Sequence, residues 1–458
     1  MARLIRGTGF GVLGLAAGLT SQMLSAQALG LPASDPVGIG RSGTGVAFGQ
    51  SLEAAALNPA LLVTLKDPAS AYLAMGLEMQ SSQTTLMSTQ HTLWSTDRNR
   101  ALPALGGAWR LSDNLVLGVK LDDPFLRHDV MSDESTFRFQ QQAIDLQTKR
   151  LEFQGAWSLN PNWSVGFGLG TARVRYASQV ALRVILPTDV NLPLSAANPS
   201  RALMELPMDQ SGQGNAMTYS LGLRWAVNPR WTFAASYQSA IRADLDLQAG
   251  HSWKTPTFLA LDGSSTPEIG TETKGPAMLN ATRAVPGNGK VVLPARAAIG
   301  VRQRYNQLLT WEVDLRYVAG KQFELPSQPA LATPSGLVAS PGVLRQPRNG
   351  YGFSGTIEMT LTKKWTLRGG MEMLSGLLDG STVEPYVGGT PTAGFSLGAS
   401  YKALGGEWSL GYQYRQSKDE KSARLDGAWA EGGFSVSTTP TQVEGMGHLM
   451  SLGFKMAF

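Results

Sequence analysis

The 458-residue chain is predicted to be an all-β protein, a transmembrane antiparallel β-barrel of about 14 strands with a small N-terminal plug, or hatch, inside the lumen. Three observations predict this class. Apolar and polar residues alternate with a period of two through most of the chain. Short turns and long connections alternate strictly between the resulting strands. Beyond the first 28 residues no run of 18 apolar residues exists, so the sequence offers no membrane-spanning helix.

Residues 1–28 have the three parts of a secretory signal peptide. Arg3 and Arg6 form a basic start, residues 7–19 are small or apolar and uncharged, and Ala26-Gln27-Ala28 is an A-x-A cleavage site. The apolar stretch is shorter than the roughly 20 residues that a spanning helix needs. The exported chain is therefore either soluble or a membrane β-barrel, which satisfies its backbone hydrogen bonds between strands.

Residues 29–68 do not alternate, so they belong to no predicted strand, and we assign them to the plug. Gly38–Gly43 formally matches the G-x-G-x-x-G pattern. It follows no apolar strand, and no βαβ unit surrounds it, so the nucleotide-binding interpretation fails. Residues 69–458 are expected to form the barrel.

The segment 309–317 shows the strand pattern clearly, because its odd-numbered residues are apolar and its even-numbered residues are polar. Successive side chains of a strand point to opposite faces, so this segment has one face for lipid and one for a polar lumen. The same pattern predicts strands near residues 69–88, 101–111, 115–123, 136–159, 163–186, 214–227, 231–249, 290–305, 308–323, 350–362, 365–374, 391–402, 406–417 and 444–458.

The connections distinguish a soluble sandwich from a membrane barrel. Every short turn follows an even-numbered strand, at residues 112–114, 160–162, 228–230, 306–307, 363–364 and 404–406. Outer-membrane barrels have short periplasmic turns and longer outside loops, and an even strand count places both termini in the periplasm. Trp163, Trp231, Trp365 and Trp408 each begin a strand after a short turn, as an aromatic girdle at the membrane interface would require.

Several function classes are excluded by composition. The chain has no cysteine, so disulfides, thiolate metal sites and cysteine nucleophiles are absent. Its four histidines are scattered, which argues against a metal site and against a Ser/His/acid enzyme. The net charge of +5 includes no Lys/Arg-rich run that would indicate nucleic acid. Glu312 and Asp314 could suggest acid–base catalysis, but they fit a neutralised lumen wall better. We expect no enzyme, no cofactor and no metal.

The chain resembles the FadL-type family of outer-membrane transporters for long-chain fatty acids and other hydrophobic compounds (OMPP1/FadL/TodX). Gly38-Ile39-Gly40-Arg41 matches the family's G-x-G-R pattern, and Asn58-Pro59-Ala60-Leu61 its Asn-Pro-Ala motif. Asp123-Pro124-Phe125-Leu126 stands where the family often has Pro-Phe-Gly-Leu, with Leu126 in place of glycine. Leu293-Pro294 matches a common Leu-Pro pair. Phe458 ends an alternating strand, as the barrel assembly machinery commonly requires.

The resemblance implies outer-membrane transport of long-chain fatty acids or other hydrophobic small molecules, in a Gram-negative bacterium. The ligand would be captured at extracellular loops, pass to a lumen pocket, and leave sideways through a gap at the third strand. Implied partners are the hydrophobic ligand, outer-membrane lipid and lipopolysaccharide, and the assembly machinery, without nucleic acid. The alternative is a nonspecific porin, which expects an unplugged lumen.

Four sets of candidate residues follow. Pro124 lacks an N–H and belongs at a strand edge or bulge, and the carboxylates of Asp122 and Asp123 beside it are costly on a lipid face. Both features fit a third strand that is kinked inward. Alternatively, Pro124 simply starts the outside loop. Asn58 and Pro59 favour a tight turn that either holds the plug or has no gating role. Apolar loop residues mark either a capture groove or a cap over the barrel. The candidates are Gly38, Gly40, Arg41, Asn58, Pro59 and Ala60 for the plug; Asp122, Asp123, Pro124 and Phe125 for the lateral opening; Arg173, Arg175 and Arg183 for a ligand carboxylate; and Phe258, Leu259, Leu261, Met278 and Leu279 for capture.

Overall fold

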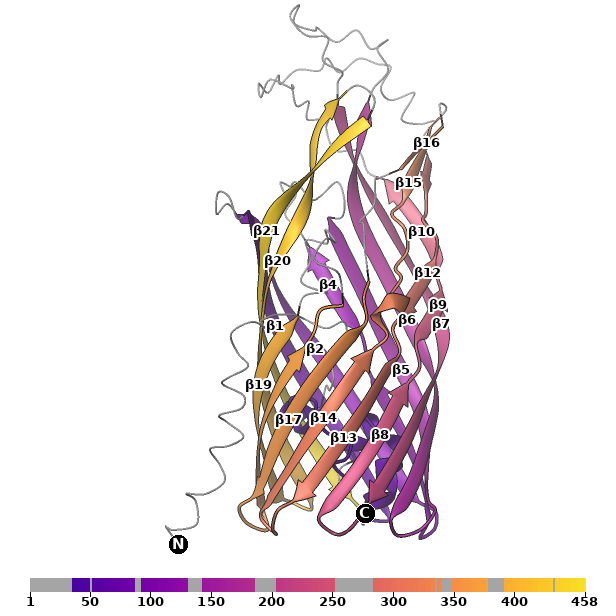
Figure 1. Ribbon diagram of the computed structural model, residues 1–458. Coiled ribbons are helices and arrows are strands. Elements are labelled where there is room, and N and C mark those ends of the chain that lie inside the picture. The colour runs from indigo at the N-terminus through magenta and orange to yellow at the C-terminus, as the bar shows by residue number, and fades with distance from the viewer. Residues whose placement is uncertain are drawn as a thin grey trace, which may run out of the picture.

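The computed structural model describes residues 35–49, 52–86, 92–130, 142–185, 203–251, 283–333, 336–339, 347–377, 391–430 and 433–458. In this part of the chain, 14 antiparallel strands form a closed barrel (Figure 1). The wall runs β1, β2, β3, β5, β6, β7, β8, β13, β14, β17, β18, β19, β20 and β21, and β21 pairs back with β1. The predicted fold class and strand number are confirmed.

The strands of the wall are β1 (Ala69–Leu86), β2 (Thr92–Arg110), β3 (Leu115–Asp122), β5 (Ala143–Ser158), β6 (Trp163–Ile185), β7 (Leu203–Ala226), β8 (Trp231–Gln238), β13 (Arg296–Arg304), β14 (Leu309–Val318), β17 (Gly350–Thr360), β18 (Trp365–Leu374), β19 (Thr392–Ala403), β20 (Gly406–Ala430) and β21 (Gly433–Ala457). Shorter strands are β4 (Leu126–Val130), β9 (Ile241–Asp244), β10 (Asp246–His251), β11 (Arg283–Val285), β12 (Lys290–Leu293), β15 (Ala330–Thr333) and β16 (Gly336–Ala339). The helical turns are α2 (Pro36–Ile39), η1 (Ala54–Ala56), η2 (Pro59–Thr64) and η4 (Gly320–Gln322).

Several strands depart from their predicted lengths. β20 and β21 remain paired far beyond the predicted ends at residues 417 and 444, and together with β6 and β7 they rise above the shorter strands of the wall (Figure 1). Outside the lipid a strand no longer needs an apolar face, so the period-two signal disappears while the hydrogen-bond ladder continues. The predicted strand 290–305 is broken at Pro294, which has no N–H to donate.

The six predicted short turns connect wall strands at one end of the barrel, and most share one hydrogen-bond pattern. The Asn160 side-chain oxygen accepts bonds from the N–H groups two and three residues later, each 2.9 Å long. Asn228, Asn306 and Thr362 do the same in their own turns. The turn at Leu404 and Gly405 instead uses two positive φ angles, 54° and 75°, which suit a two-residue hairpin turn. The side chains of Asn160, Asn228, Asn306 and Thr362 thus fix four of the turns and hence the register of the strands that these turns join.

The outward face of the wall is apolar and bounded by aromatic rings. Near the short turns, Trp163 stacks on Trp225 with ring centroids 5.2 Å apart, and Trp408 packs on Phe454 at 4.6 Å. At the other edge of the apolar surface lie outward tyrosines, including Tyr219, Tyr237, Tyr317, Tyr351 and Tyr414. Two such girdles of aromatic side chains are typical of the two interfaces of a membrane barrel.

Residues 35–49 and 52–68, here called the N-terminal segment, lie inside the barrel near the short turns (Figure 1). α2 contacts β19, β20 and β21, whereas η2 contacts β3, β5, β6 and β7. Glycines of the wall make room for this approach. A Cβ added to Gly166 or Gly222 would collide with the backbone of Ala60 or with the Asn58 side chain. Glycine at these wall positions therefore leaves the space that the N-terminal segment occupies.

Candidate functional site

The third strand of the wall is interrupted at residues 123–125. β3 and β4 both pair with β5, but Asp122 is opposite Arg150 and Leu126 is opposite Gln147, so β3 and β4 contain one extra residue. Such an insertion is a β-bulge, which bends a strand and re-aims side chains. Pro124 at its centre lacks an N–H, and Thr148 bonds Phe125 on both sides: the Phe125 N–H donates to its Oγ1 at 2.9 Å, and that hydroxyl donates to the Phe125 carbonyl at 2.7 Å.

The wall also loses a pairing beside this bulge. β2 pairs with β1 as far as Thr92, but its pairing with β3 ends at Leu105 opposite Leu121. Among the described residues, β4 pairs with β5 and not with β2. Arg100 of β2 reaches across this part of the wall, and its guanidinium lies 3.7 Å from the carboxylate of Asp145 on β5. The upper edge of β2 is thus without a strand partner on the side of β4.

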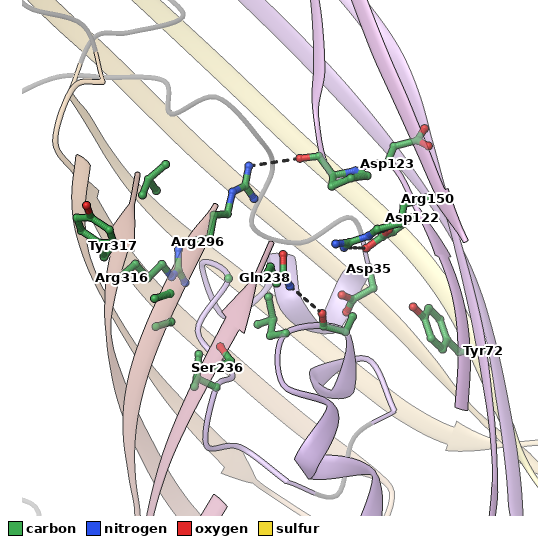
Figure 2. A pocket seen from close by; sticks show the side chains of 18 residues that line it. Asp35, Tyr72, Asp122, Asp123, Arg150, Ser236, Gln238, Arg296, Arg316 and Tyr317 are labelled. Carbon is green, nitrogen blue, oxygen red and sulfur yellow. Dashed lines mark hydrogen bonds and ion pairs between the residues drawn. The ribbon is translucent and has the colours of Figure 1, made fainter. Parts of the chain in front are cut away.

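A cavity of about 110 Å³ lies inside the barrel next to the bulge (Figure 2). It is bounded by the N-terminal segment on one side and by β13 and β14 on the other. Its polar lining includes Asp35, Tyr72, Asp122, Asp123, Arg150, Gln238, Arg296 and Arg316. Figure 2 shows Arg296 pointing from β13 toward the end of β3, where it donates a long 3.5 Å bond to the Pro124 carbonyl. The charged lining of the cavity therefore comes mainly from the wall and the bulge, whereas the N-terminal segment contributes Asp35 beside small and apolar residues.

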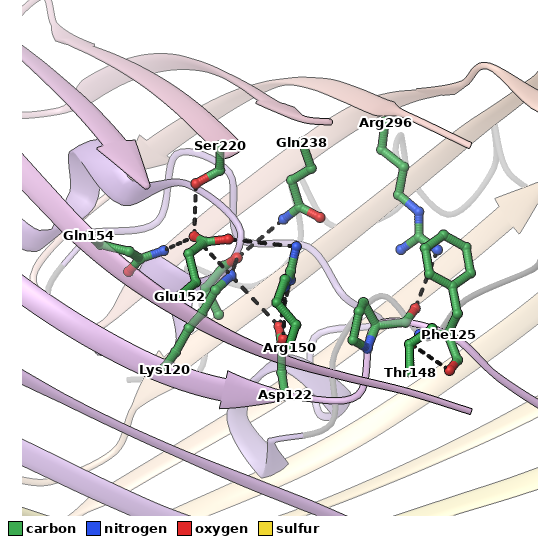
Figure 3. Close-up of polar contacts among 12 residues, drawn as sticks. Lys120, Asp122, Phe125, Thr148, Arg150, Glu152, Gln154, Ser220, Gln238 and Arg296 are labelled. Carbon is green, nitrogen blue, oxygen red and sulfur yellow. Dashed lines mark hydrogen bonds and ion pairs between the residues drawn. The ribbon is translucent and has the colours of Figure 1, made fainter. Parts of the chain in front are cut away.

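Buried ion pairs connect the bulge to the neighbouring strands (Figure 3). Asp122 accepts two bonds from Arg150, at 2.9 Å and 2.6 Å. Glu152, fully buried, lies 3.5 Å from Lys120 and accepts 2.8 Å bonds from Gln154 and Ser220. Lys120 also donates to the Ala56 carbonyl at 2.8 Å. Each charge has an opposite charge beside it, so the network fixes the position of β3 below the bulge at a tolerable desolvation cost.

An apolar cluster adjoins the cavity at Arg296, which lines the cavity and contacts Phe125 of the cluster. It contains Phe125, Ile144, Leu146, Val174, Tyr176, Ile241, Val291, Leu293, Phe323 and Leu325. The Phe125 ring belongs to it, and the Arg296 guanidinium lies 4.2 Å from the centre of that ring. A cation over an aromatic face is electrostatically favourable. One buried guanidinium thus lies at the boundary between the polar cavity and the apolar cluster, a setting that suits a molecule with an apolar tail and an anionic head.

The N-terminal segment is held by wall carboxylates that the sequence alone assigned only to a lumen wall. Asp314 accepts bonds from the Gly45 and Val46 N–H groups at 2.8 Å and 3.2 Å, and Glu312 from Ala47 at 2.7 Å. Arg41 bonds Glu358 at 2.6 Å. The alternation of 309–317 placed Glu312 and Asp314 on the inner face correctly, but it held no signal for their backbone partners.

The Asn-Pro-Ala motif forms the start of η2. The Asn58 side chain donates to the Val46 carbonyl at 2.8 Å and to Leu223 of the wall at 3.2 Å, and its Oδ1 accepts from the Ala60 N–H at 3.1 Å. Pro59 takes the first helical position, where no N–H is needed. One side chain thereby joins the helix start, the preceding loop and β7. Gly38 and Gly40 lie in or beside α2, and Asp35 caps that turn through a 2.7 Å bond from Gly38.

Asp35 also contributes an electrostatic feature to the cavity. Its carboxyl is fully enclosed, and burial raises its pKa to about 6, with a further contribution from nearby Glu53. The Gly38 N–H and Arg41 oppose this shift. Near neutral pH the carboxyl therefore carries a charge that its surroundings disfavour, at the point where the N-terminal segment meets the cavity.

The other predicted site residues are placed differently. Arg173 and Arg175 are exposed on the outer face of β6, the face of Phe167 and Leu169, so the structure does not bring them to the cavity. Arg183 lies in β6, with its side chain outside the described residues. The capture-loop candidates also lie outside the described residues: Phe258, Leu259, Leu261, Met278 and Leu279. Arg296, which the sequence analysis missed, occupies the position that was expected of a cationic partner.

Nothing in the described residues resembles a catalytic centre. Gly394–Gly398 reads G-x-S-x-G, but Ser396 lies inside β19 rather than on a strand-to-helix turn, and its hydroxyl bonds Ser42 at 2.9 Å. Within the described ranges, no group of three His, Asp or Glu side chains could hold a metal ion. No helix in these ranges is long and apolar enough to cross a membrane.

Comparisons with known proteins agree with this architecture. The family model for outer membrane protein transport proteins (OMPP1/FadL/TodX) matches residues 17–458. Similar solved structures include a Pseudomonas aeruginosa FadL homologue, with 17% identity, a TM-score of 0.70, and coverage of 94% of this chain and 100% of that one. The Ralstonia pickettii toluene transporter TbuX has 15% identity and a TM-score of 0.57, with coverage of 93% and 99%. The P. putida toluene transporter TodX has 12% identity and a TM-score of 0.58, with the same coverage. No curated protein matches.

Proposed function

The chain belongs to the OMPP1/FadL/TodX family of outer-membrane transport proteins, and from that premise we propose that it carries long-chain fatty acids or related hydrophobic molecules, releasing them sideways through the wall at β3. Membership confirms the predicted family, the outer-membrane location and a transport role rather than an enzymatic one. The ligand, the route and the orientation of the termini belong to the proposal.

The bulge at residues 123–125 beside the cavity is the observation that carries this proposal. A fatty acid gains roughly 0.8 kcal/mol for each CH₂ that leaves water, so a water-filled path through the barrel is unfavourable for it. The unpaired edge of β2 and the adjacent apolar cluster offer a path toward lipid instead. Polar backbone groups at this edge would be costly in lipid alone, so we expect water or ligand beside them.

The cavity supports a ligand with an anionic head. Arg296 lies between Phe125 and the Pro124 carbonyl, so a carboxylate could bond its guanidinium while the tail lies along the apolar cluster. An aromatic hydrocarbon would use the apolar cluster without Arg296. Two relatives are toluene transporters, so we keep both ligand classes as arms of one test.

We propose that the N-terminal segment is the plug of this transporter, within a hatch of residues 29–68. Its bonds from Asn58, Arg41 and residues 45–47 to the wall support this role, because they hold it across the lumen. Capture would occur at outside loops that include Phe258 and Met278. Both termini would lie in the periplasm, at the end with the short turns.

Deletion of Pro124 tests the route. Without it, Asp123 would oppose Lys149 and Phe125 would oppose Thr148, so β3 and β4 would become one continuous strand. We expect the deletion variant to abolish uptake of labelled oleate by a Gram-negative host that lacks its own fatty-acid transporter. Pro124→Ala keeps the bulge length and should retain uptake. Heat-shifted gel mobility confirms folding of both variants.

Three outcomes, one from this test and two from companion assays, count against the proposal. Normal oleate uptake by the folded deletion variant would rule out the β3 route. Toluene uptake without oleate uptake by the unmodified protein would replace the fatty acid with an aromatic ligand. Passage of sugars through liposomes that contain the purified protein, independent of any ligand, would favour the nonspecific porin.

A further inference from the structure

The outer face of the wall carries a row of cations directly beyond its lipid-facing surface. On β6, Phe167 and Leu169 are apolar and each 56% exposed, and Arg173 and Arg175 follow on the same face. Lys149 of β5 pairs with Arg173 and is also exposed. We call Lys149, Arg173 and Arg175 the basic row. These side chains point away from the cavity, so the transport site does not use them.

Strand register places the basic row at the boundary of the apolar surface. Leu151, Thr171 and Met217 stand side by side on β5, β6 and β7, and Met217 is 77% exposed. The next outward residues on these strands are Lys149, Arg173 and Asn215. Two residues of a strand advance about 7 Å, so the first charged groups lie one step beyond the last exposed apolar side chains. We expect the headgroups of the adjoining leaflet at that level.

The basic row borders a groove that could hold a headgroup. Its volume is about 800 Å³, and Arg173, Arg175, Gln213, Asn215 and Gln248 contribute to its lining. Arg173 donates to the neutral amide of Gln213. Two carboxylates also face the groove. Asp145 lies further from the lipid and forms an ion pair with Arg100, and Asp246 is separated from Arg175 by the width of β7. The cations are therefore nearest the lipid, with the carboxylates beyond or beside them.

We propose that the basic row binds the phosphate groups of lipid A, the anionic anchor of lipopolysaccharide in the outer leaflet. The charge is complementary, and guanidinium groups match phosphate oxygens in geometry. The exposed apolar side chains of Leu169 and Met217 just below would contact the acyl chains of the same lipid. The inference rests on the proposed orientation, which puts the long strands outside, but not on the ligand or on the route through β3.

The test measures retention of bisphosphorylated lipid A on detergent-purified protein by native mass spectrometry. The variant Lys149→Ala/Arg173→Ala/Arg175→Ala should bind about a hundredfold more weakly, because each cation near a membrane surface contributes a factor of several. The control Arg230→Ala/Lys363→Ala/Lys364→Ala removes the same charge from exposed turns at the other end and should bind normally. Heat-shifted mobility confirms that every variant is folded.

Three results would overturn the proposal. They are unchanged binding by the basic-row variant, an equal loss in the control variant, and equal retention of lipid A stripped of its phosphates. The chain has no cysteine, so Gln248→Cys and Lys363→Cys give single labelling sites for an impermeant maleimide on intact cells. Labelling at position 363 and not at 248 would place the basic row in the inner leaflet and reject it as a lipid A site. Oleate uptake is read separately, so failure of transport leaves this result intact.

Discussion

On the side of β17 to β20 the N-terminal segment touches the wall directly, whereas on the other side a cavity separates it from the bulge after β3 and from Arg296 at the start of β13. On the first side, Gly398 approaches Gly40 so closely that neither could carry a side chain, and Arg41 bonds Glu358 at 2.6 Å. On the second side, Asp122 and Arg150 pair with each other at the same distance, and Arg296 lies across the cavity from them.

The two sides use the same chemistry for different ends. Buried guanidinium–carboxylate pairs occur on both: Arg41–Glu358 joins the segment to the wall on the first, and Asp122–Arg150 joins β3 to β5 on the second. On the second, the pair is internal to the wall and fixes β3 below its bulge. The ion pairs beside the cavity therefore fix the wall where the proposed opening lies, while those on the far side hold the segment in place.

Removal of one buried carboxylate on each side should have the largest effect. Glu358→Gln and Asp122→Asn each leave a buried guanidinium without its closest carboxylate, so each should lower the free energy of unfolding by about 3 kcal/mol. Unfolding in urea, followed by heat-shifted mobility, measures the loss. Uptake of oleate per folded molecule should fall for Asp122→Asn and remain normal for Glu358→Gln. Equal uptake by the two variants would show that the pair beside the cavity has no part in transport.

Substitution of a wall glycine that contacts the N-terminal segment should have a second, smaller effect, on the position of that segment. Gly222→Ala would place a methyl group against Asn58 Oδ1, whereas Gly369→Ala meets nothing closer than 3.8 Å. We expect Gly222→Ala to displace η2 and to let small sugars leak through liposomes that contain the protein, without loss of the barrel. Gly369→Ala is the matched control and should stay sealed. A sealed Gly222→Ala barrel would contradict the proposed plug.

The sequence predicted the barrel because alternation reports directly on a wall between lipid and lumen. The strands 163–186 and 365–374 were placed within a residue of their observed ends. Beyond the lipid this signal vanishes, which explains why the long pairing of β20 with β21 was missed. Partners distant in sequence, such as Asp314 with Gly45 and Val46, leave no local pattern at all.

Parity within a strand explains the misplaced arginines. Arg173 and Arg175 have odd numbers, as do Phe167 and Leu169, so all four share the outer face of β6. The alternation therefore already held the signal that these arginines face away from the lumen. By contrast, Arg296 follows the break at Pro294 and begins its strand, where alternation has no preceding residues to define a face. Its role became visible only from the contacts with Phe125 and Pro124.

Substitution of Arg296, beside the cavity, should distinguish an anionic ligand from a neutral one. Its expected effect on uptake is the smallest. Loss of one charged hydrogen bond to a carboxylate costs about 1.4 kcal/mol, or tenfold, so Arg296→Ala should reduce oleate uptake by that factor. Toluene has no anionic group, so its uptake should not change. Arg296→Lys keeps the charge but loses the fork geometry and should lie between the two. Competition uptake of labelled oleate and toluene in the same cells measures both. A parallel fall for both ligands would mean that Arg296 supports only the shape of the bulge, through Phe125 and the Pro124 carbonyl.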